Sequence, residues 1–215
     1  MESVNQNSAG IFAIIPVMNV NKLLKPVVFI LCLLPLLFLI WQGFNNALGV
    51  NPAETILDTM GNWAIYMLLI TLTVTPFRKL TGWGGVIRLR RMFGLFAFFY
   101  VCLHLLSYVW FDQYFDWNEI LKDIIKRPFI TLGFATFLLL IPLVITSTNK
   151  MMVRLKKNWK VLHQLVYPIS IMAVVHFFLM TRADFRHPII IASLLSLLLA
   201  YRLFVYFQKQ QKIKA

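Results

Sequence analysis

Four histidines are the side chains of this 215-residue sequence whose types and spacing suit redox or metal chemistry: His104, His163, His176 and His187. Neutral imidazole is a common axial ligand of haem iron, and such cofactors bind between the facing helices of a bundle. A lone histidine in a bundle is more often a hydrogen-bonded packing residue than a ligand. Here three histidines lie in two apolar stretches, which favours a haem-binding function.

The depth of the histidines along their apolar stretches predicts which of them pair. His104 lies twelve residues after Met92, where its stretch begins, which is about 18 Å along a helix. His176 lies sixteen residues after Lys160, at the start of the other stretch. Both stretches run in the same direction, so the two imidazoles reach comparable depths in the outer half of the bundle. We therefore predict that His104 and His176 are the axial ligands of one haem iron.

The position of His163 separates it from this pair. It lies thirteen residues, or about 20 Å, from His176, too far for both to bind one iron. Two interpretations stay open: His163 marks a second metal site, or it is an interfacial histidine that bonds headgroups or a loop carbonyl. For a second haem, the partner positions hold Arg90 and Arg91, which stay protonated and so suit a haem propionate rather than iron.

The other candidate groups favour packing over chemistry. His187 precedes Pro188 where the last apolar stretch begins, so we interpret it as a helix-start residue. Cys32 and Cys102 lie in different stretches without the C-x-x-C spacing of a metal site, and we interpret both as small apolar packing residues. The sequence has no paired nucleophile and base, no carboxylate dyad and no phosphate-binding loop. Hydrolysis and phosphoryl transfer therefore have no support.

The composition indicates which elements must position the histidines. The chain is 60% hydrophobic and 13% charged, whereas soluble domains are about 45–50% apolar and about 25% charged. A water-soluble fold is therefore close to excluded. A helix needs about 20 mainly apolar residues to cross a bilayer. Six stretches approach this length: 26–43, 62–77, 92–111, 129–146, 160–181 and 188–207.

These stretches predict an all-α integral membrane protein with a six-helix transmembrane bundle. We expect the second stretch to end at Thr75-Pro76, because proline interrupts a helix. The transmembrane haem domain is expected over 22–208, after an N-terminal extension over 1–21 and before a basic tail over 209–215. The apolar segment Ile11–Met18 is too short to span and has no preceding basic residue, so a cleaved signal peptide is not expected.

The distribution of charge predicts the orientation of the bundle. Cytoplasmic segments carry an excess of Lys and Arg. The two terminal segments and the second and fourth loops hold 15 basic residues, whereas the first, third and fifth loops hold 5. Acidic residues show the reverse distribution, so both termini are predicted to be cytoplasmic. The net charge of +13 then reflects the excess of basic residues in the cytoplasmic segments and does not indicate nucleic-acid binding.

We have two further expectations, one for an arginine in the last span and one for the third loop. Arg202 lies in the last span near its cytoplasmic end, where its side chain is expected to reach the lipid headgroups. In the third loop, 112–128, apolar residues recur at roughly helical spacing among charged ones. It is predicted to be either a short helix on the outer interface or an irregular amphipathic connector.

Seven ordered sequence strings carry a family resemblance over about 22–207. They are GVNPAE at 49–54, TVTP at 73–76, RLRRMFGL at 88–95, FFYVCLH at 98–104, KRPFIT at 126–131, LIPLVITS at 140–147 and WKVLHQLVY at 159–167. The chain resembles the MsrQ family, also called YedZ, of the ferric-reductase-like transmembrane group. The family's haem-associated histidines fall on His104, His163 and His176. The third span lacks one of the two histidines expected in two-haem ferric reductases.

The resemblance implies a haem b protein of the bacterial inner membrane. It would take electrons from a cytoplasmic flavin reductase or quinol and pass them to MsrP, a periplasmic molybdopterin enzyme that reduces methionine sulfoxide in envelope proteins. The chain would be the electron-transfer subunit rather than the catalytic one. FMN is also implied by the resemblance, although no motif in the sequence places it.

Two other classes of function stand beside this one. The first is a self-contained membrane ferric or quinone reductase, which shares the haem and differs in its acceptor. The second is a non-redox transporter in which the histidines form a proton or metal path. The near absence of carboxylates inside the spans argues against the transporter.

Overall fold

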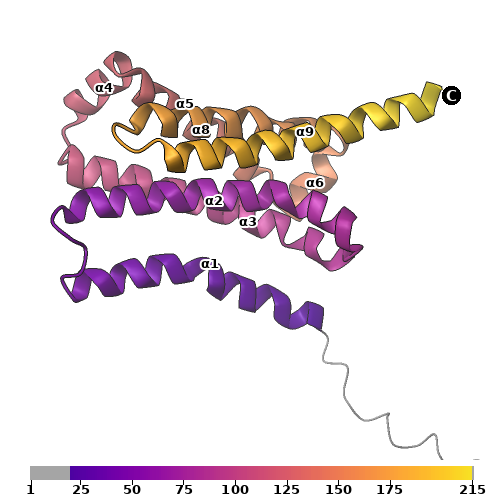
Figure 1. Ribbon diagram of the computed structural model, residues 1–215, viewed down its shortest axis with the longest axis horizontal. Coiled ribbons are helices and arrows are strands. Elements are labelled where there is room, and N and C mark those ends of the chain that lie inside the picture. The colour runs from indigo at the N-terminus through magenta and orange to yellow at the C-terminus, as the bar shows by residue number, and fades with distance from the viewer. Residues whose placement is uncertain (1–19, 215) are drawn as a thin grey trace, which may run out of the picture.

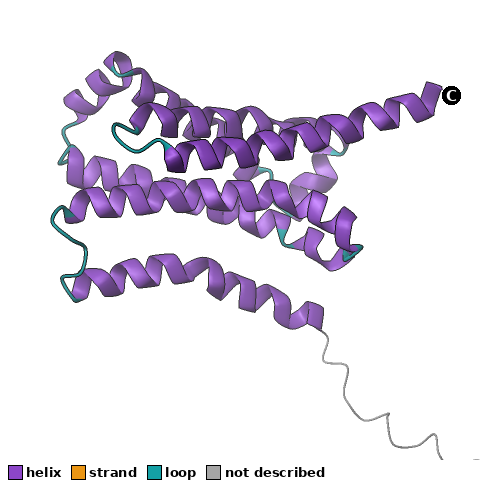
Figure 2. Cartoon of the chain, in the orientation of Figure 1, coloured by secondary structure: helices purple, strands orange, loops and turns teal. Residues whose placement is uncertain are grey.

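The structure is a computed structural model that describes residues 20–214. Residues 1–19, which include most of the expected N-terminal extension and the segment Ile11–Met18, lie outside the described residues. The described part is helical throughout, with short connections (Figures 1 and 2). Its elements are α1 (Val20–Phe44), α2 (Pro52–Thr81), η1 (Gly84–Arg88), α3 (Arg90–Ser107), the π-helical turn η2 (Tyr108–Asp112), α4 (Trp117–Lys126), α5 (Pro128–Ile145), α6 (Asn149–Leu155), α7 (Lys157–Leu162), η3 (His163–Leu165), α8 (Val166–Met180) and α9 (Arg186–Lys214).

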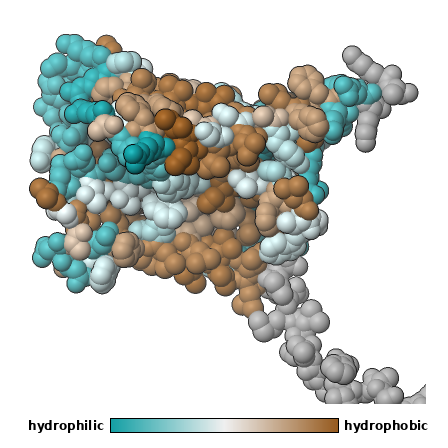
Figure 3. All heavy atoms as spheres, viewed as in Figure 1, coloured by the Kyte–Doolittle hydropathy of each residue, from teal (hydrophilic) through white to brown (hydrophobic). Residues whose placement is uncertain are grey.

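Six helical segments are long and apolar enough to cross a membrane, which confirms the predicted all-α bundle. They are Leu23–Phe44, Pro52–Thr81, Gly84–Asp112, Pro128–Ile145, Lys157–Met180 and Arg186–Gln211. On the face seen in Figure 3, apolar side chains cover most of the middle, and hydrophilic ones gather most densely over α4. This is the surface expected of a multi-pass membrane protein, whose lipid-facing side chains remain outside the core.

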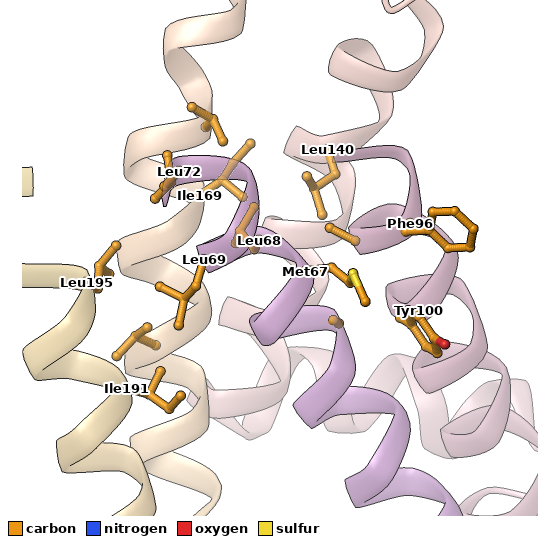
Figure 4. Close-up of a cluster of buried hydrophobic side chains, with 14 of the residues drawn as sticks. Met67, Leu68, Leu69, Leu72, Phe96, Tyr100, Leu140, Ile169, Ile191 and Leu195 are labelled. Carbon is orange, nitrogen blue, oxygen red and sulfur yellow. The ribbon is translucent and has the colours of Figure 1, made fainter. Parts of the chain in front are cut away.

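Two helix pairs form the centre of the bundle. α2 packs along α3, α5 packs along α8, and α9 lies against both α2 and α8 (Figure 1). The buried core contains Leu72 of α2, Tyr100 of α3 and Ile169 of α8, each with no exposed surface (Figure 4). α1 is joined to this core by a hydrogen bond from the Tyr100 hydroxyl to the Cys32 carbonyl at 2.6 Å.

The two ends of the bundle differ in charge. We call the end formed by 45–51, 113–127 and 181–185 the acidic end, because all seven acidic residues of the described chain lie at or near it. The opposite end, formed by 82–89 and 146–160, carries basic residues only and is called the basic end. In Figure 1 the acidic end is on the left and the basic end on the right. Which end faces the cytoplasm stays a prediction from charge.

The expected end of the second span at Pro76 is wrong. α2 continues through Pro76 to Thr81 and ends where Gly82 takes a left-handed conformation, with φ of 71°. Proline has no N–H group, so the carbonyl of Leu72, one turn earlier, loses its helical partner. Arg202 of α9 supplies the missing donor, because its Nη2 donates to the Leu72 carbonyl at 2.8 Å.

The expectation that the Arg202 side chain reaches the lipid headgroups is also wrong. Its side chain points into the bundle rather than toward the headgroups, and its Nη1 also donates to the Tyr167 hydroxyl at 2.7 Å. In a bilayer the backbone groups freed by proline are satisfied by neighbouring helices. The guanidinium performs this role for α2 and at the same time joins α2, α8 and α9.

The third loop contains the short helix α4, which decides between the two structures expected for it. The Asp116 side chain caps the helix by accepting from the amides of Asn118 and Glu119. Asp123 is 6% exposed and accepts hydrogen bonds from the Tyr108 hydroxyl at 3.1 Å and from Gln113 Nε2 at 3.0 Å. These contacts fix α4 to the turn that follows α3. Its place at a membrane interface stays a prediction.

The hydrogen bond from Arg202 to the Leu72 carbonyl replaces the backbone bond that Pro76 cannot make, and this replacement can be tested. Arg202→Met should lower the free energy of unfolding in detergent, because an unsatisfied buried acceptor costs about 1–3 kcal/mol. In a Pro76→Ala background the restored amide satisfies the Leu72 carbonyl, so the same substitution should cost less. Chemical denaturation of the four proteins in a double-mutant cycle measures this coupling.

Tyr167→Phe is the matched control, since it removes the other partner of Arg202 and leaves the Leu72 carbonyl bonded. Its cost should be the same with proline or alanine at position 76. Equal losses for Arg202→Met in both backgrounds would contradict the assignment.

Candidate haem-binding site

The structure brings His104 of α3 and His176 of α8 together in the core of the bundle. Their ring centroids are 6.3 Å apart, and the ring planes make an angle of 78°. His104 lies three residues before the end of α3, and His176 lies four residues before the end of α8. The pair is therefore at one level and closer to the acidic end, as the depth comparison predicts.

His104 is held by the neighbouring helix α2. Its Nδ1 lies 3.0 Å from the Leu57 carbonyl oxygen. Gly61, one turn further along α2, lies directly against the ring: a Cβ there would be 3.0 Å from both Cε1 and Nδ1 of His104. The absence of a side chain at Gly61 is what lets the imidazole reach the Leu57 carbonyl.

His176 is held in the same way by α5. Its Nδ1 lies 2.7 Å from the Phe129 carbonyl oxygen, and a Cβ at Gly133 would be 2.8 Å from its Cε1. In both cases the histidine follows its carbonyl partner by 47 residues, and the glycine follows that partner by one helical turn. The same arrangement of carbonyl, glycine and histidine therefore occurs in the helix pairs α2–α3 and α5–α8.

These hydrogen bonds assign the tautomer of both rings. A carbonyl oxygen only accepts, so Nδ1 must carry the proton and Nε2 must keep its lone pair. A histidine that ligates a metal almost always donates its other ring N–H to such a partner, which orients the ring and raises its basicity. Both imidazoles are therefore prepared to bind a metal through Nε2.

The spacing of the rings fits a haem iron between them. Imidazole nitrogen binds a metal at about 2 Å, and the centre of the ring lies about 1 Å beyond the nitrogen. Two axial imidazoles on opposite sides of one iron therefore have centroids about 6 Å apart, close to the observed 6.3 Å. A porphyrin supplies the other ligands of the iron, so two histidines complete the set.

His163 belongs to a different cluster. It lies in η3 at the basic end, where its Nε2 is 3.1 Å from Thr146 Oγ1. Trp159 stacks on the His163 ring with centroids 4.0 Å apart and donates its Nε1–H to the Thr146 carbonyl at 2.9 Å. The structure does not bring His163 to the His104–His176 pair. A hydroxyl, rather than the expected loop carbonyl, is the partner at its Nε2.

His187 makes a contact that the sequence did not indicate. Its Nε2 lies 2.7 Å from the Tyr66 hydroxyl, and its ring packs edge-on against Phe177 at 5.2 Å. It is therefore more than a helix-start residue, because it joins the first turn of α9 to the middle of α2. Cys32 and Cys102 are both free thiols; Cys32 is buried in the hydrophobic core, and Cys102 is half-buried.

Comparison with known proteins gives a family for the fold and site described above. The family model for the ferric reductase like transmembrane component matches residues 60–174. A relative from Herminiimonas arsenicoxydans is 49% identical over 196 residues, covering 90% of each chain. A relative from Rhodospirillum rubrum is 50% identical over 187 residues, covering 85% of this chain and 88% of its own.

A third relative, from Xanthomonas euvesicatoria, is 50% identical over 163 residues, covering 76% of this chain and 75% of its own. All three relatives are named protein-methionine-sulfoxide reductase heme-binding subunit MsrQ. No solved structure matches the chain.

The glycines beside the histidines make a prediction that does not alter any proposed ligand. Gly133→Ala should reduce the haem bound per chain, because its Cβ would meet three atoms of the His176 ring at 3.2 Å or less and must displace it. Gly61→Ala should act in the same direction and less strongly, since its closest ring contact is 3.0 Å rather than 2.8 Å. The haem count and visible spectrum of the purified variants measure both effects.

Gly94→Ala is the matched control, because it also lies within a membrane-spanning helix and its Cβ would meet only Thr71, at 3.8 Å. This variant should bind haem as the unmodified protein does. A uniform loss in all three variants would show that added volume in the bundle, rather than displacement of the imidazoles, causes the effect.

Proposed function

Because the chain belongs to the MsrQ family of ferric-reductase-like membrane proteins, we propose that it is the haem b electron-transfer subunit of an inner-membrane methionine sulfoxide reductase system. The observation that carries this proposal is the His104–His176 pair, with both Nδ1 atoms bonded to carbonyls and the rings 6.3 Å apart. The catalytic subunit would be a separate periplasmic protein.

His104 and His176 would hold the haem iron through Nε2. When bound, haem b supplies a one-electron iron couple, whose potential depends on the ligands, their hydrogen bonds and the surrounding polarity. The carbonyls of Leu57 and Phe129 keep both rings oriented and basic.

The position of the pair supports electron delivery at the acidic end. His176 lies four residues before the end of α8, and His104 lies eight residues before the end of the span Gly84–Asp112. A protein docked at this end would therefore be nearer to the iron than one docked at the basic end. We propose that the acceptor there is an MsrP-like molybdopterin reductase, which repairs oxidised methionine in envelope proteins.

The basic end suits the electron donor. The charged residues of 82–89 and 146–160, which form this end, are all basic. Charge complementarity of this kind steers an acidic protein toward its docking site. We propose a cytoplasmic flavin reductase as donor, with quinol as the alternative source of electrons. FMN is part of the proposal on the family resemblance alone.

The family match also supports a second candidate, a self-contained membrane ferric or quinone reductase. It would use the same histidine pair and differ only in the acceptor. Reduced protein in liposomes distinguishes the two. An MsrP-like reductase with methionine sulfoxide should reoxidise the haem faster than chelated ferric iron or a soluble quinone. The reverse order would favour the second candidate.

Removal of either proposed ligand tests the site itself. His104→Ala and His176→Ala should each abolish most of the bound haem and its reducible low-spin spectrum, because one imidazole cannot hold the iron in six-coordinate form. A pyridine haemochrome count and reduced-minus-oxidised spectra give the measurement.

His187→Ala is the control for the loss of a histidine from the bundle. It removes the bond to Tyr66 and leaves the pair untouched, so the haem should remain. Retention of the full spectrum in both ligand variants would overturn the assignment. A count near one haem per chain that survives His163→Ala would give His163 the interfacial role.

A further inference from the structure

A buried carboxylate lies at the acidic end, outside the histidine pair. Asp123 belongs to α4, the short helix that connects the segment after α3 with the start of α5 (Figure 1). Its Oδ2 accepts from the Tyr108 hydroxyl and from Gln113 Nε2, and its Oδ1 forms an ion pair with Arg127 Nε at 2.9 Å. A buried carboxylate that loses such partners is costly, so these three donors hold it in one place.

One side of this network reaches the segment that carries His104. Tyr108 stands one helical turn after His104, and its backbone N–H donates to the His104 carbonyl. Tyr108 also begins the π-helical turn η2, which Gln113 closes by donating its backbone N–H to the Tyr108 carbonyl at 3.0 Å. Asp123 therefore accepts from the first residue of this turn and from the residue that closes it. Wide turns of this kind are frequent at functional sites.

The other side of the network reaches the helix that holds His176. Arg127 bonds to Asp123 twice, through the ion pair and through its backbone N–H, which donates to the Asp123 carbonyl at 2.9 Å. Arg127 is also the residue from which α5 begins, since Pro128 is the first residue of that helix. Phe129 follows, and its carbonyl oxygen lies 2.7 Å from His176 Nδ1. The two bonds to Asp123 therefore fix where α5 begins, and with it the carbonyl that orients His176.

Asp123 is the directional link between these two supports. Within the described residues 20–214, the side-chain bonds that join 105–115 to 123–129 all end on its carboxylate. Apolar packing between α3 and α5 is non-directional, whereas charge-assisted hydrogen bonds have a defined geometry. A functional site needs its groups held within about 0.5 Å and about 10–20° of their working positions. The ring spacing of 6.3 Å and the angle of 78° depend on how the two supports are placed.

We infer that Asp123 is a positioning residue for the His104–His176 pair. Its hydrogen bonds go to neither imidazole, and it acts through Tyr108 on one side and through Arg127 on the other. Its carboxylate keeps the end of α3 and the start of α5 in the relative placement that sets the ring angle. The inference rests on the proposed function in one respect, because the two histidines must bind haem for this placement to affect the iron.

Asp123→Asn is the test variant, because it keeps the shape of the side chain and leaves one acceptor oxygen for three donors. Glu119→Gln is the matched control. It removes the same charge from the same helix, at an exposed side chain whose partner is Lys122 at 2.8 Å. Tyr108→Phe is the milder variant, since it removes one hydrogen bond to Asp123 and leaves the ion pair with Arg127 in place.

Two measurements on the haem-loaded protein report the placement of the rings: electron paramagnetic resonance of the oxidised haem, and the rate of haem transfer to excess apomyoglobin. Asp123→Asn should lower the largest g value, because rings held less firmly depart from 78°. It should also release haem about 10-fold faster, which corresponds to the loss of one charge-assisted hydrogen bond. Tyr108→Phe should change both in the same direction by less, and the double variant should match Asp123→Asn alone, because Tyr108 acts through Asp123. Glu119→Gln should change neither.

An unchanged spectrum and release rate in Asp123→Asn, with only a lower thermal stability, would overturn the inference, because the residue would then only fasten α4. Equal changes in Asp123→Asn and Glu119→Gln, or additive effects in the double variant, would also overturn it. If Asp123→Asn does not fold, Tyr108→Phe decides: a lower g value supports the inference and an unchanged one overturns it. Retention of haem by His104→Ala and His176→Ala contradicts the proposed function instead, so the two failures are distinguished.

Discussion

Within a bilayer no water is available to satisfy a polar group, so each carbonyl, hydroxyl or ring nitrogen inside the spans needs a partner in the protein. In this bundle many Ser and Thr hydroxyls donate to a carbonyl one turn earlier in their own helix, whereas several larger side chains find partners on neighbouring helices. Tyr100 reaches the carbonyl of Cys32, His187 reaches Tyr66, and Arg202 reaches the carbonyl that Pro76 leaves without a donor. These bonds join α1 to α3 and α9 to α2, and the second bond of Arg202, to Tyr167, joins α9 to α8. Apolar packing alone is non-directional.

The same requirement prepares the histidine pair for its chemistry. The Nδ1–H of an imidazole inside the spans must find an acceptor, and α2 and α5 each offer a carbonyl one turn before a glycine. Satisfying Nδ1 in this way leaves Nε2 unprotonated, with its lone pair free to bind a metal. The backbone carbonyl that satisfies each imidazole within the fold therefore also fixes the tautomer of the proposed ligand. The repetition of this arrangement on two helix pairs places both rings at one level.

Much of the fold follows from local sequence properties. Apolar length predicts the six spans, and residue counts along two of them predict that His104 and His176 meet. The contacts that the sequence did not indicate join residues far apart in the chain. His187 and Tyr66 are 121 residues apart, and Arg202 and Leu72 are 130 apart. Hydrophobic periodicity describes one helix at a time and contains no record of such partners.

Pro76 shows why a rule that holds for an isolated helix failed here. Proline ends a helix when the carbonyl four residues earlier has no other hydrogen-bond donor. Here Arg202 of α9 is the donor for that carbonyl. The sequence likewise did not indicate the role of Gly61 and Gly133, because that role depends on a histidine ring from another helix. The haem ligands, the orientation and the partners stay predictions.

The central claim is that two imidazoles from opposing helices bind one iron with their planes far from parallel. Electron paramagnetic resonance of the oxidised, purified protein tests it most directly, because the spectrum of ferric haem depends on the number and relative orientation of its axial imidazoles. With ring planes at 78°, the account predicts a strongly anisotropic low-spin signal. A predominantly high-spin signal, as given by an iron with only one axial histidine, would contradict it.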